Sequence, residues 1–221
     1  MIYKTKQERA EEARRIFSNS EFKEEDHPRG DDGKFGKGGG GASEKIKKNI
    51  EDISKKVKFQ DGKQASNAKE MVSVLNDLGI KAKYNDDYTT APLQMRHGEE
   101  EIQINGGCDF WRNPKKMFKK IKEGDYSSSE WTHVIAHEMA HIGNTFEPKK
   151  REFEKEEEKK IANKVSRYST DNKNEFIAEY IAGGISGKIY DDEVNSLYNK
   201  YMRELSTKSN SSPVKVYRAP K

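Results

Sequence analysis

The chain has 221 residues, a length that suits one domain of moderate size with additional segments. It is 36% charged and only 32% hydrophobic, so we expect part of it to be solvated tail or linker rather than core. The net charge of +4 comes from interspersed basic and acidic residues, whereas a nucleic-acid-binding protein is expected to have a clustered basic face, so nucleic-acid binding is not predicted.

The single cysteine, Cys108, excludes an intramolecular disulfide and a cysteine-rich zinc knuckle. The N-terminal sequence lacks the apolar stretch of a signal peptide, and no run approaches the roughly 18 apolar residues of a membrane span. We therefore expect a soluble protein that is made in the cytoplasm and has no membrane partner. Export without a cleavable signal peptide is an open alternative.

Residues 1–25 are predicted to form a helical N-terminal arm, and residues 26–43 a flexible linker. Seven of the 17 glycines lie between Gly30 and Gly41, and such a segment loses too much backbone entropy to fold alone. Its "DHPRGDDGKFGKG" stretch resembles a short linker motif of phage head-morphogenesis proteins, which implies a phage origin and association with a phage particle or a larger carrier protein. His27 in this linker is not expected to bind metal, because a flexible loop gives it no preorganised partners.

Residues 44–206 are predicted to form one α+β domain, in which a small mixed sheet packs against several helices. Alternation predicts strands at 80–84 and 101–105. Helical spacing, glycine stops and one Ser-x-x-Glu capping pattern at Ser127 and Glu130 predict the helices, at 46–57, 68–78, 114–123, 127–143, 149–166, 172–182 and 190–206. Residues 207–221 are predicted to be a flexible tail.

The segment "WTHVIAHEMAHIGN" at 131–144 contains the pattern H-E-x-x-H at "HEMAH". Residues four apart lie on one face of a helix, so His137 and His141 can bind one Zn²⁺. Glu138 is rotated by about 100° from His137 and can act as general base toward a zinc-bound water. Apolar neighbours predict that this helix is buried, where unpartnered histidines and a carboxylate would be costly.

His133 lies one helical turn before His137, on the same face of the helix. Three histidines at this spacing span about 12 Å of helix axis, too far for one tetrahedral zinc. His133 is therefore expected to support a ligand through a hydrogen bond or to pack in the core.

A catalytic zinc commonly has three protein ligands. Glu175 and Glu179 in "RYSTDNKNEFIAEYIAGG" lie one turn apart on a second predicted helix, among apolar residues. We expect one to bind zinc, with Glu175 preferred, and the other to accept a hydrogen bond from a ligand histidine. Asn172 and Glu175 also fit a capping box, which is the structural alternative. His97 is a less favoured third ligand because its neighbours form a charge run.

"HEMAH" followed by "YSTDNKNEFIAE" resembles the metalloprotease family of anthrax lethal factor and the clostridial Pro-Pro endopeptidases, over about residues 133–182. Six residues fit that family's second motif: Tyr168, Asn172, Glu175, Phe176, Ala178 and Glu179.

The resemblance implies a zincin-like fold with the H-E-x-x-H helix at its centre and one catalytic Zn²⁺. It implies His137, His141 and Glu175 as ligands and Glu138 as general base. It further implies Tyr168 as oxyanion donor and Glu179 in a supporting position. In this family an edge strand pairs with an extended substrate, and residues 101–105 are the candidate here. The charged interval between the motifs departs from the family, so contacts in the substrate cleft cannot be transferred.

The sequence thus predicts a zinc endopeptidase that acts on a protein or peptide substrate. It does not distinguish a phage maturation protease from a toxin delivered into another cell, associated with a virion or secreted without a cleavable signal. The alternative from another class is a phage structural or accessory protein in which zinc only stabilises the fold, as expected if four protein ligands close the site.

Overall fold

The computed structural model describes residues 41–86, 91–95, 101–119, 124–144 and 151–210. The predicted arm, most of the linker with His27, the residue His97 and the tail beyond residue 210 lie outside these ranges. The division into arm, linker, domain and tail therefore stays a prediction.

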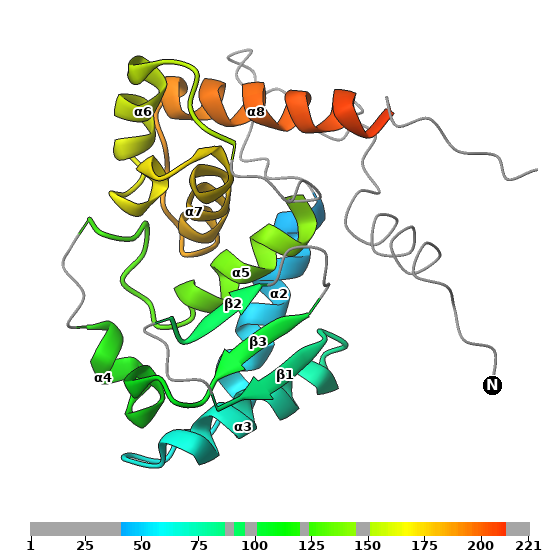
Figure 1. Cartoon of the computed structure of the whole chain (residues 1–221), viewed down its shortest axis with the longest axis vertical. Helices are drawn as coiled ribbons and strands as arrows, with labels where there is room; N and C mark the ends of the chain where they lie inside the picture. The colour runs from blue at the N-terminus through cyan, green and yellow to red at the C-terminus, as the bar shows by residue number, and fades with distance from the viewer. Residues whose placement is uncertain (1–40, 87–90, 96–100, 120–123, 145–150, 211–221) are drawn as a thin grey trace, which may run out of the picture.

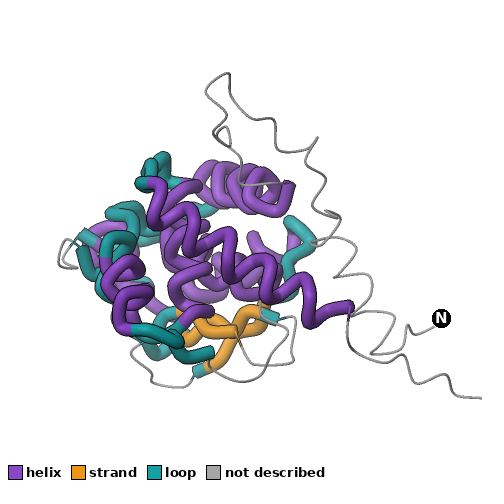
Figure 2. The backbone as a smooth tube through the Cα atoms, turned by 90° about the horizontal axis from the view of Figure 1, so that it is seen from above, coloured by secondary structure: helices purple, strands orange, loops and turns teal. Residues whose placement is uncertain are grey.

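The described residues have an α+β fold, as predicted, with seven α-helices and a three-stranded sheet. In Figure 1, α5 runs between the sheet and α7, and α8 crosses the end of the molecule beyond α7. Figure 2 shows the strands gathered on one side of the helices. The elements are α2 (Gly41–Lys56), α3 (Gln64–Asp77), β1 (Ala82–Asn85), β2 (Leu93–Met95), β3 (Ile102–Asn105), η2 (Asp109–Arg112), α4 (Pro114–Phe118), α5 (His133–Asn144), α6 (Glu156–Asn163), η3 (Tyr168–Thr170), α7 (Lys173–Ile185) and α8 (Asp192–Asn210).

The sheet is mixed, with the strand order β1-β3-β2. β1 pairs with β3 in parallel, whereas β2 pairs with β3 in antiparallel register, with Gln94 opposite Gln103. The expectation that residues 101–105 form an edge strand is wrong: β3 is the central strand and all four of its residues are buried. The edge near α5 belongs to β2, a strand of three residues that periodicity did not reveal.

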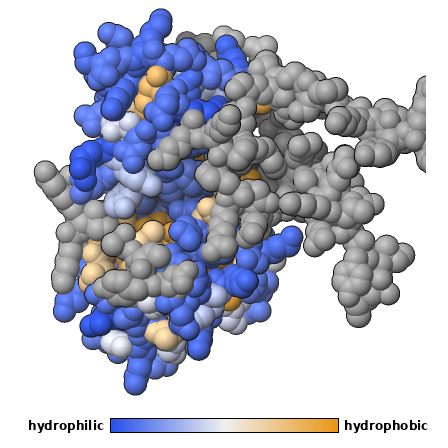
Figure 3. Space-filling view, viewed as in Figure 1, coloured by the Kyte–Doolittle hydropathy of each residue, from blue (hydrophilic) through white to orange (hydrophobic). Residues whose placement is uncertain are grey.

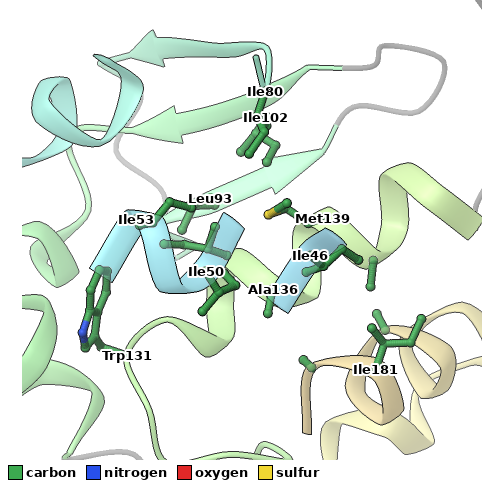
Figure 4. Close-up of a cluster of buried hydrophobic side chains, with 14 of the residues drawn as sticks. Ile46, Ile50, Ile53, Ile80, Leu93, Ile102, Trp131, Ala136, Met139 and Ile181 are labelled. Carbon is green, nitrogen blue, oxygen red and sulfur yellow. The ribbon is translucent and has the colours of Figure 1, made fainter. Parts of the chain in front are cut away.

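The hydrophobic core lies between the sheet, α2 and α5. Ile46, Ile50 and Ile53 recur at helical spacing along α2 and are all buried. Figure 4 shows them beside Leu93 of β2 and Met139 of α5, so that α2 joins the sheet to the helix carrying the histidines. Burying one such side chain contributes roughly 1.5–3 kcal/mol, so this packing helps to fix the position of α5.

The helix predicted from residue 127 begins only at His133. The capping pattern misled because Ser127 is used elsewhere: its backbone N–H donates to Glu179 Oε2 at 2.7 Å, and its hydroxyl donates to the Glu179 carbonyl at 2.6 Å. Ser127 bonds to α7, and the residues after it do not continue as a helix until His133, so Ser127 is not the N-cap of α5. The segment before α5 is therefore a connection that α7 holds in place.

The helix predicted over 149–166 is confined to α6, and residues 151–155 are not helical. Arg151 lies against the start of α7, where its carbonyl accepts from Lys173 N at 2.8 Å and its Nε donates to Asn174 Oδ1 at 2.8 Å. These contacts commit the segment to an extended path.

The face in Figure 3 is largely hydrophilic, in keeping with the high content of charged residues. Within the described ranges, no helix is both long enough and apolar enough to cross a bilayer.

Candidate metal centre

The candidate centre lies between two helices that pack side by side, α5 and α7 (Figure 1). On α5, Ile135 and Met139 are buried, and the histidines occupy the face toward α7. The motif "HEMAH" therefore lies on a packed helix, as the apolar residues around it predicted.

The start of α7 is fixed by Asn172. Its side-chain oxygen accepts from the backbone N–H groups of Asn174 at 2.9 Å and Glu175 at 3.2 Å, so Asn172 is the N-cap that the capping pattern allowed. Phe176 and Ala178 are fully buried and anchor the first turns. The cap and these contacts direct Glu175 and Glu179 toward α5.

Three predicted ligand residues meet at one point. His137 Nε2 lies 2.9 Å from Glu175 Oε2 and 3.0 Å from His141 Nε2, and His141 Nε2 lies 3.3 Å from Glu175 Oε2. These atoms form one of the two groups of His, Cys, Asp or Glu donors in the described residues that could hold a metal ion. His137 is buried, and His141 and Glu175 are half-buried.

This triangle fits a tetrahedral metal ion. Ligand atoms about 2.0–2.1 Å from a common zinc at tetrahedral angles lie roughly 3.3 Å from one another. The separation of 3.3 Å between His141 Nε2 and Glu175 Oε2 matches this value, and the two separations at His137 Nε2, 2.9 and 3.0 Å, are shorter. Two imidazoles and one carboxylate are also a donor set typical of zinc. Among the described residues this group contains three donors. The fourth position of a tetrahedral ion would therefore be left for another molecule.

The hydrogen bonding of His137 also favours a cation at this point. Its Nδ1 lies 2.8 Å from Glu179 Oε1 and must donate, which leaves a lone pair on Nε2 in the neutral ring. That lone pair faces the Glu175 carboxylate, and two acceptors require a proton or a metal ion between them. Burial lowers the pKa of His137, but the hydrogen bonds to Glu175 and Glu179 outweigh it and raise this pKa to about 10. The surroundings thus strongly favour positive charge at His137 Nε2.

Glu179 is at the centre of a second, fully buried cluster. Its Oε1 accepts from His133 Nε2 at 2.7 Å and from His137 Nδ1, and its Oε2 accepts from Ser127 N. Burial raises the pKa of Glu179, but the hydrogen bonds from the two histidines outweigh it and lower the pKa. The carboxylate therefore stays ionised and fixes the orientation of His137.

His133 Nε2 bonds to Glu179, and no atom of His133 belongs to the ligand triangle, which agrees with the argument from helical rise. His133, His137 and Glu179 form the other group of possible metal ligands. Both oxygens of Glu179 already accept hydrogen bonds, Oε2 from Ser127 N and Oε1 from the two histidines at 2.7 and 2.8 Å, which are distances of charge-assisted hydrogen bonds. We therefore interpret this group as the support of the triangle.

Glu138 lies beside the triangle, and a hydrogen bond from the sheet fixes its carboxylate. Its Oε2 accepts from the backbone N–H of Met95, on β2, at 2.9 Å. Burial raises the pKa of this carboxyl, and His137, His141 and the Met95 N–H partly oppose that effect. A carboxyl with a raised pKa is suited to accepting a proton.

Tyr168 lies on η3, and the residue is 37% exposed. Its ring centroid is 5.5 Å from that of His137 and 5.5 Å from that of Tyr126. Burial, and then the charges of Glu175 and Glu138, raise the pKa of its phenol. The hydroxyl therefore stays protonated and can donate a hydrogen bond.

Sequence reasoning missed several residues that hold the site together. Ser127 and the Met95 N–H act through the backbone, and Tyr126 packs against the rings of His133 and Tyr168. Gly183 is a further one: a Cβ there would lie 2.0 Å from Tyr190 Oη and 2.9 Å from Ser127 Cβ. The "GG" after the second motif was the only sequence signal of this close approach.

The structure thus brings together His137, His141, Glu175, Glu138 and Tyr168, with Glu179 and His133 behind them. Comparisons of the chain with protein-family models, with curated proteins and with solved structures find no match.

Proposed function

We propose that this chain is a zinc-dependent endopeptidase with a zincin-like fold, similar to anthrax lethal factor and the Pro-Pro endopeptidases. The observation that carries the proposal is the triangle of His137 Nε2, His141 Nε2 and Glu175 Oε2, with Glu138 and Tyr168 beside it. A metal-binding triad, a carboxylate base and a protonated phenol together make up the groups that metal-assisted peptide hydrolysis requires.

His137, His141 and Glu175 would hold one Zn²⁺. When bound, this ion supplies a Lewis acid that polarises the peptide carbonyl and increases the acidity of water. The buried Glu179 carboxylate keeps His137 in the tautomer that presents Nε2 to the ion.

Glu138 accepts the proton of the attacking water and passes it to the leaving amine. Its raised pKa suits both steps, because the carboxyl must gain a proton and then release it. Tyr168 donates its phenolic hydrogen to the oxygen of the scissile carbonyl as negative charge develops there.

The edge of β2 supports an extended peptide as the substrate. Asn105 N donates to Pro92 O across the β2–β3 pair, so by alternation the backbone groups of Leu93 and Met95 point away from β3. A peptide strand can pair with such groups, beside Glu138. This edge replaces residues 101–105 as the substrate-binding strand.

A purely structural zinc is the alternative. It would require a closed set of four protein ligands, whereas the described residues contribute three. A phage maturation protease and a delivered toxin share the proposed chemistry, and the phage-type linker supports carriage on a larger particle in either case.

The test is metal analysis of the purified full chain, followed by incubation with a peptide library in the presence and absence of a chelator. One zinc per chain and cleavage that the chelator abolishes are expected. Glu138→Ala is the matched variant, since it should retain zinc but cleave nothing. A zinc-loaded protein that cleaves no peptide would favour the structural alternative.

A further inference from the structure

A backbone group of β2 contacts the side chain of Glu138 on α5. Met95 N–H donates to Glu138 Oε2 at 2.9 Å, and these residues lie 43 positions apart in the chain. We propose that the Met95 N–H is a positioning group that fixes the carboxylate of Glu138, so that one oxygen is bound to the sheet and Oε1 is directed to the reaction. This inference rests on the proposed peptidase function.

The geometry of the strand makes this N–H available. The backbone groups of residues 92 and 94 point toward β3. Among the described residues, no further strand pairs with the outer side of β2. The outward N–H of Met95 therefore has two possible partners: the Glu138 side chain or the backbone of a bound peptide.

The observed bond assigns the N–H to Glu138. A glutamate has three rotatable side-chain bonds, and a charge-assisted hydrogen bond restricts them to the arrangement that faces the triangle. Glu138 is thus fixed at both ends, by its backbone in α5 and by the hydrogen bond of its carboxylate to β2, and these two elements pack against each other. Preorganisation of this kind avoids reorientation of the base during the reaction.

The assignment also limits how a peptide can bind. An extended peptide on the edge of β2 can use the N–H and C=O of Leu93 and the C=O of Met95, but not the Met95 N–H. The peptide residue opposite Met95 therefore has a carbonyl without a donor from the strand, next to Glu138.

A spectroscopic experiment tests the contact without reference to catalysis. The chain has six methionines, so selective ¹⁵N-methionine labelling gives a sparse amide spectrum, in which loss of one peak in Met95→Leu identifies Met95. Glu138→Ala should shift the Met95 amide resonance and speed its hydrogen exchange at least tenfold. Glu175→Ala is the control, because it removes a carboxylate that bonds to His137 instead. A Met95 amide that responds equally to both substitutions, or to neither, would overturn the proposal.

A kinetic experiment on the full chain then separates positioning from substrate binding. Met95→Pro removes the N–H at an edge position, where proline is tolerated because no ladder hydrogen bond is lost. We expect kcat to fall about 10- to 100-fold, the effect of losing one hydrogen bond to a charged group, with KM nearly unchanged. Met95→Leu keeps the N–H but changes the same side chain, so its kcat should fall less than that of Met95→Pro. A raised KM with unchanged kcat would assign the N–H to the substrate and refute the proposal. If the wild-type chain cleaves no peptide, the peptidase function fails, while the amide experiment still decides whether Met95 holds Glu138.

Discussion

Replacing Glu179 by glutamine tests whether this residue supports the metal centre from behind. Both of its carboxylate oxygens are acceptors, Oε1 for His133 Nε2 and His137 Nδ1, and Oε2 for Ser127 N. The glutamine amide has the same shape but only one acceptor oxygen. If that oxygen faces the histidines, its NH₂ group confronts the Ser127 N–H, and two donors meet at a site where Glu179 is fully buried.

The expected loss of stability follows from that unpaired donor. A buried N–H without an acceptor costs about 1–3 kcal/mol, and the histidines lose a charged partner as well. Loss of a hydrogen bond that orients a ligand typically weakens metal binding 10- to 100-fold. We therefore expect Glu179→Gln to unfold at lower urea concentration and to bind zinc about 10- to 100-fold more weakly.

Two measurements check this expectation. Urea unfolding of the metal-free protein gives the stability, and competition with a chromophoric chelator gives the zinc affinity. Glu175→Gln is the matched variant, because it removes the negative charge of a proposed ligand without unpairing the Ser127 N–H. It should weaken zinc binding more than Glu179→Gln and destabilise the metal-free protein less. The reverse order for zinc affinity would show that the two glutamates have exchanged roles.

Three further substitutions test the catalytic and packing arguments. Glu138→Ala should abolish peptide cleavage and leave the zinc content at one per chain, and loss of zinc on metal analysis would refute its role as base. Tyr168→Phe should raise the barrier by about 2.7–4 kcal/mol, a 100- to 1,000-fold loss of kcat, whereas unchanged turnover would remove it as oxyanion donor. Gly183→Ala should lower stability by about 1–3 kcal/mol in thermal unfolding, because its methyl group overlaps the Tyr190 hydroxyl; a wild-type Tm would mean that Tyr190 moves freely.

Sequence reasoning was most successful where geometry is local. His137 and His141 are one helical turn apart, so their approach follows from the periodicity of a single helix. The same holds for Glu175 and Glu179, and for the cap formed by Asn172. The approach of Glu175 to the histidines is different, because it depends on how α5 and α7 pack. The spacing of the two glutamates and their apolar neighbours predicted that one of them would bind zinc, with Glu175 preferred, and the family resemblance implied the same residue.

The contacts that were missed connect distant parts of the backbone. Ser127 N and Glu179 are 52 residues apart, and Met95 N and Glu138 are 43 residues apart. A backbone N–H has no side-chain signature, so no motif could reveal either bond. Ser127 fits a capping pattern in the sequence, but its hydrogen bonds go to α7. A prediction from neighbouring residues alone therefore placed the start of α5 too early.

The proposed ligands come from two helices, with His137 and Glu175 separated by 38 residues. An ion that binds only when these helices are docked stabilises the docked state, by about 4 kcal/mol when its free concentration is 1,000 times its Kd. Zinc would then hold α5 and α7 together, and these helices would separate more often after the metal is withdrawn. The amount of available zinc would therefore govern how long the folded protein resists proteases.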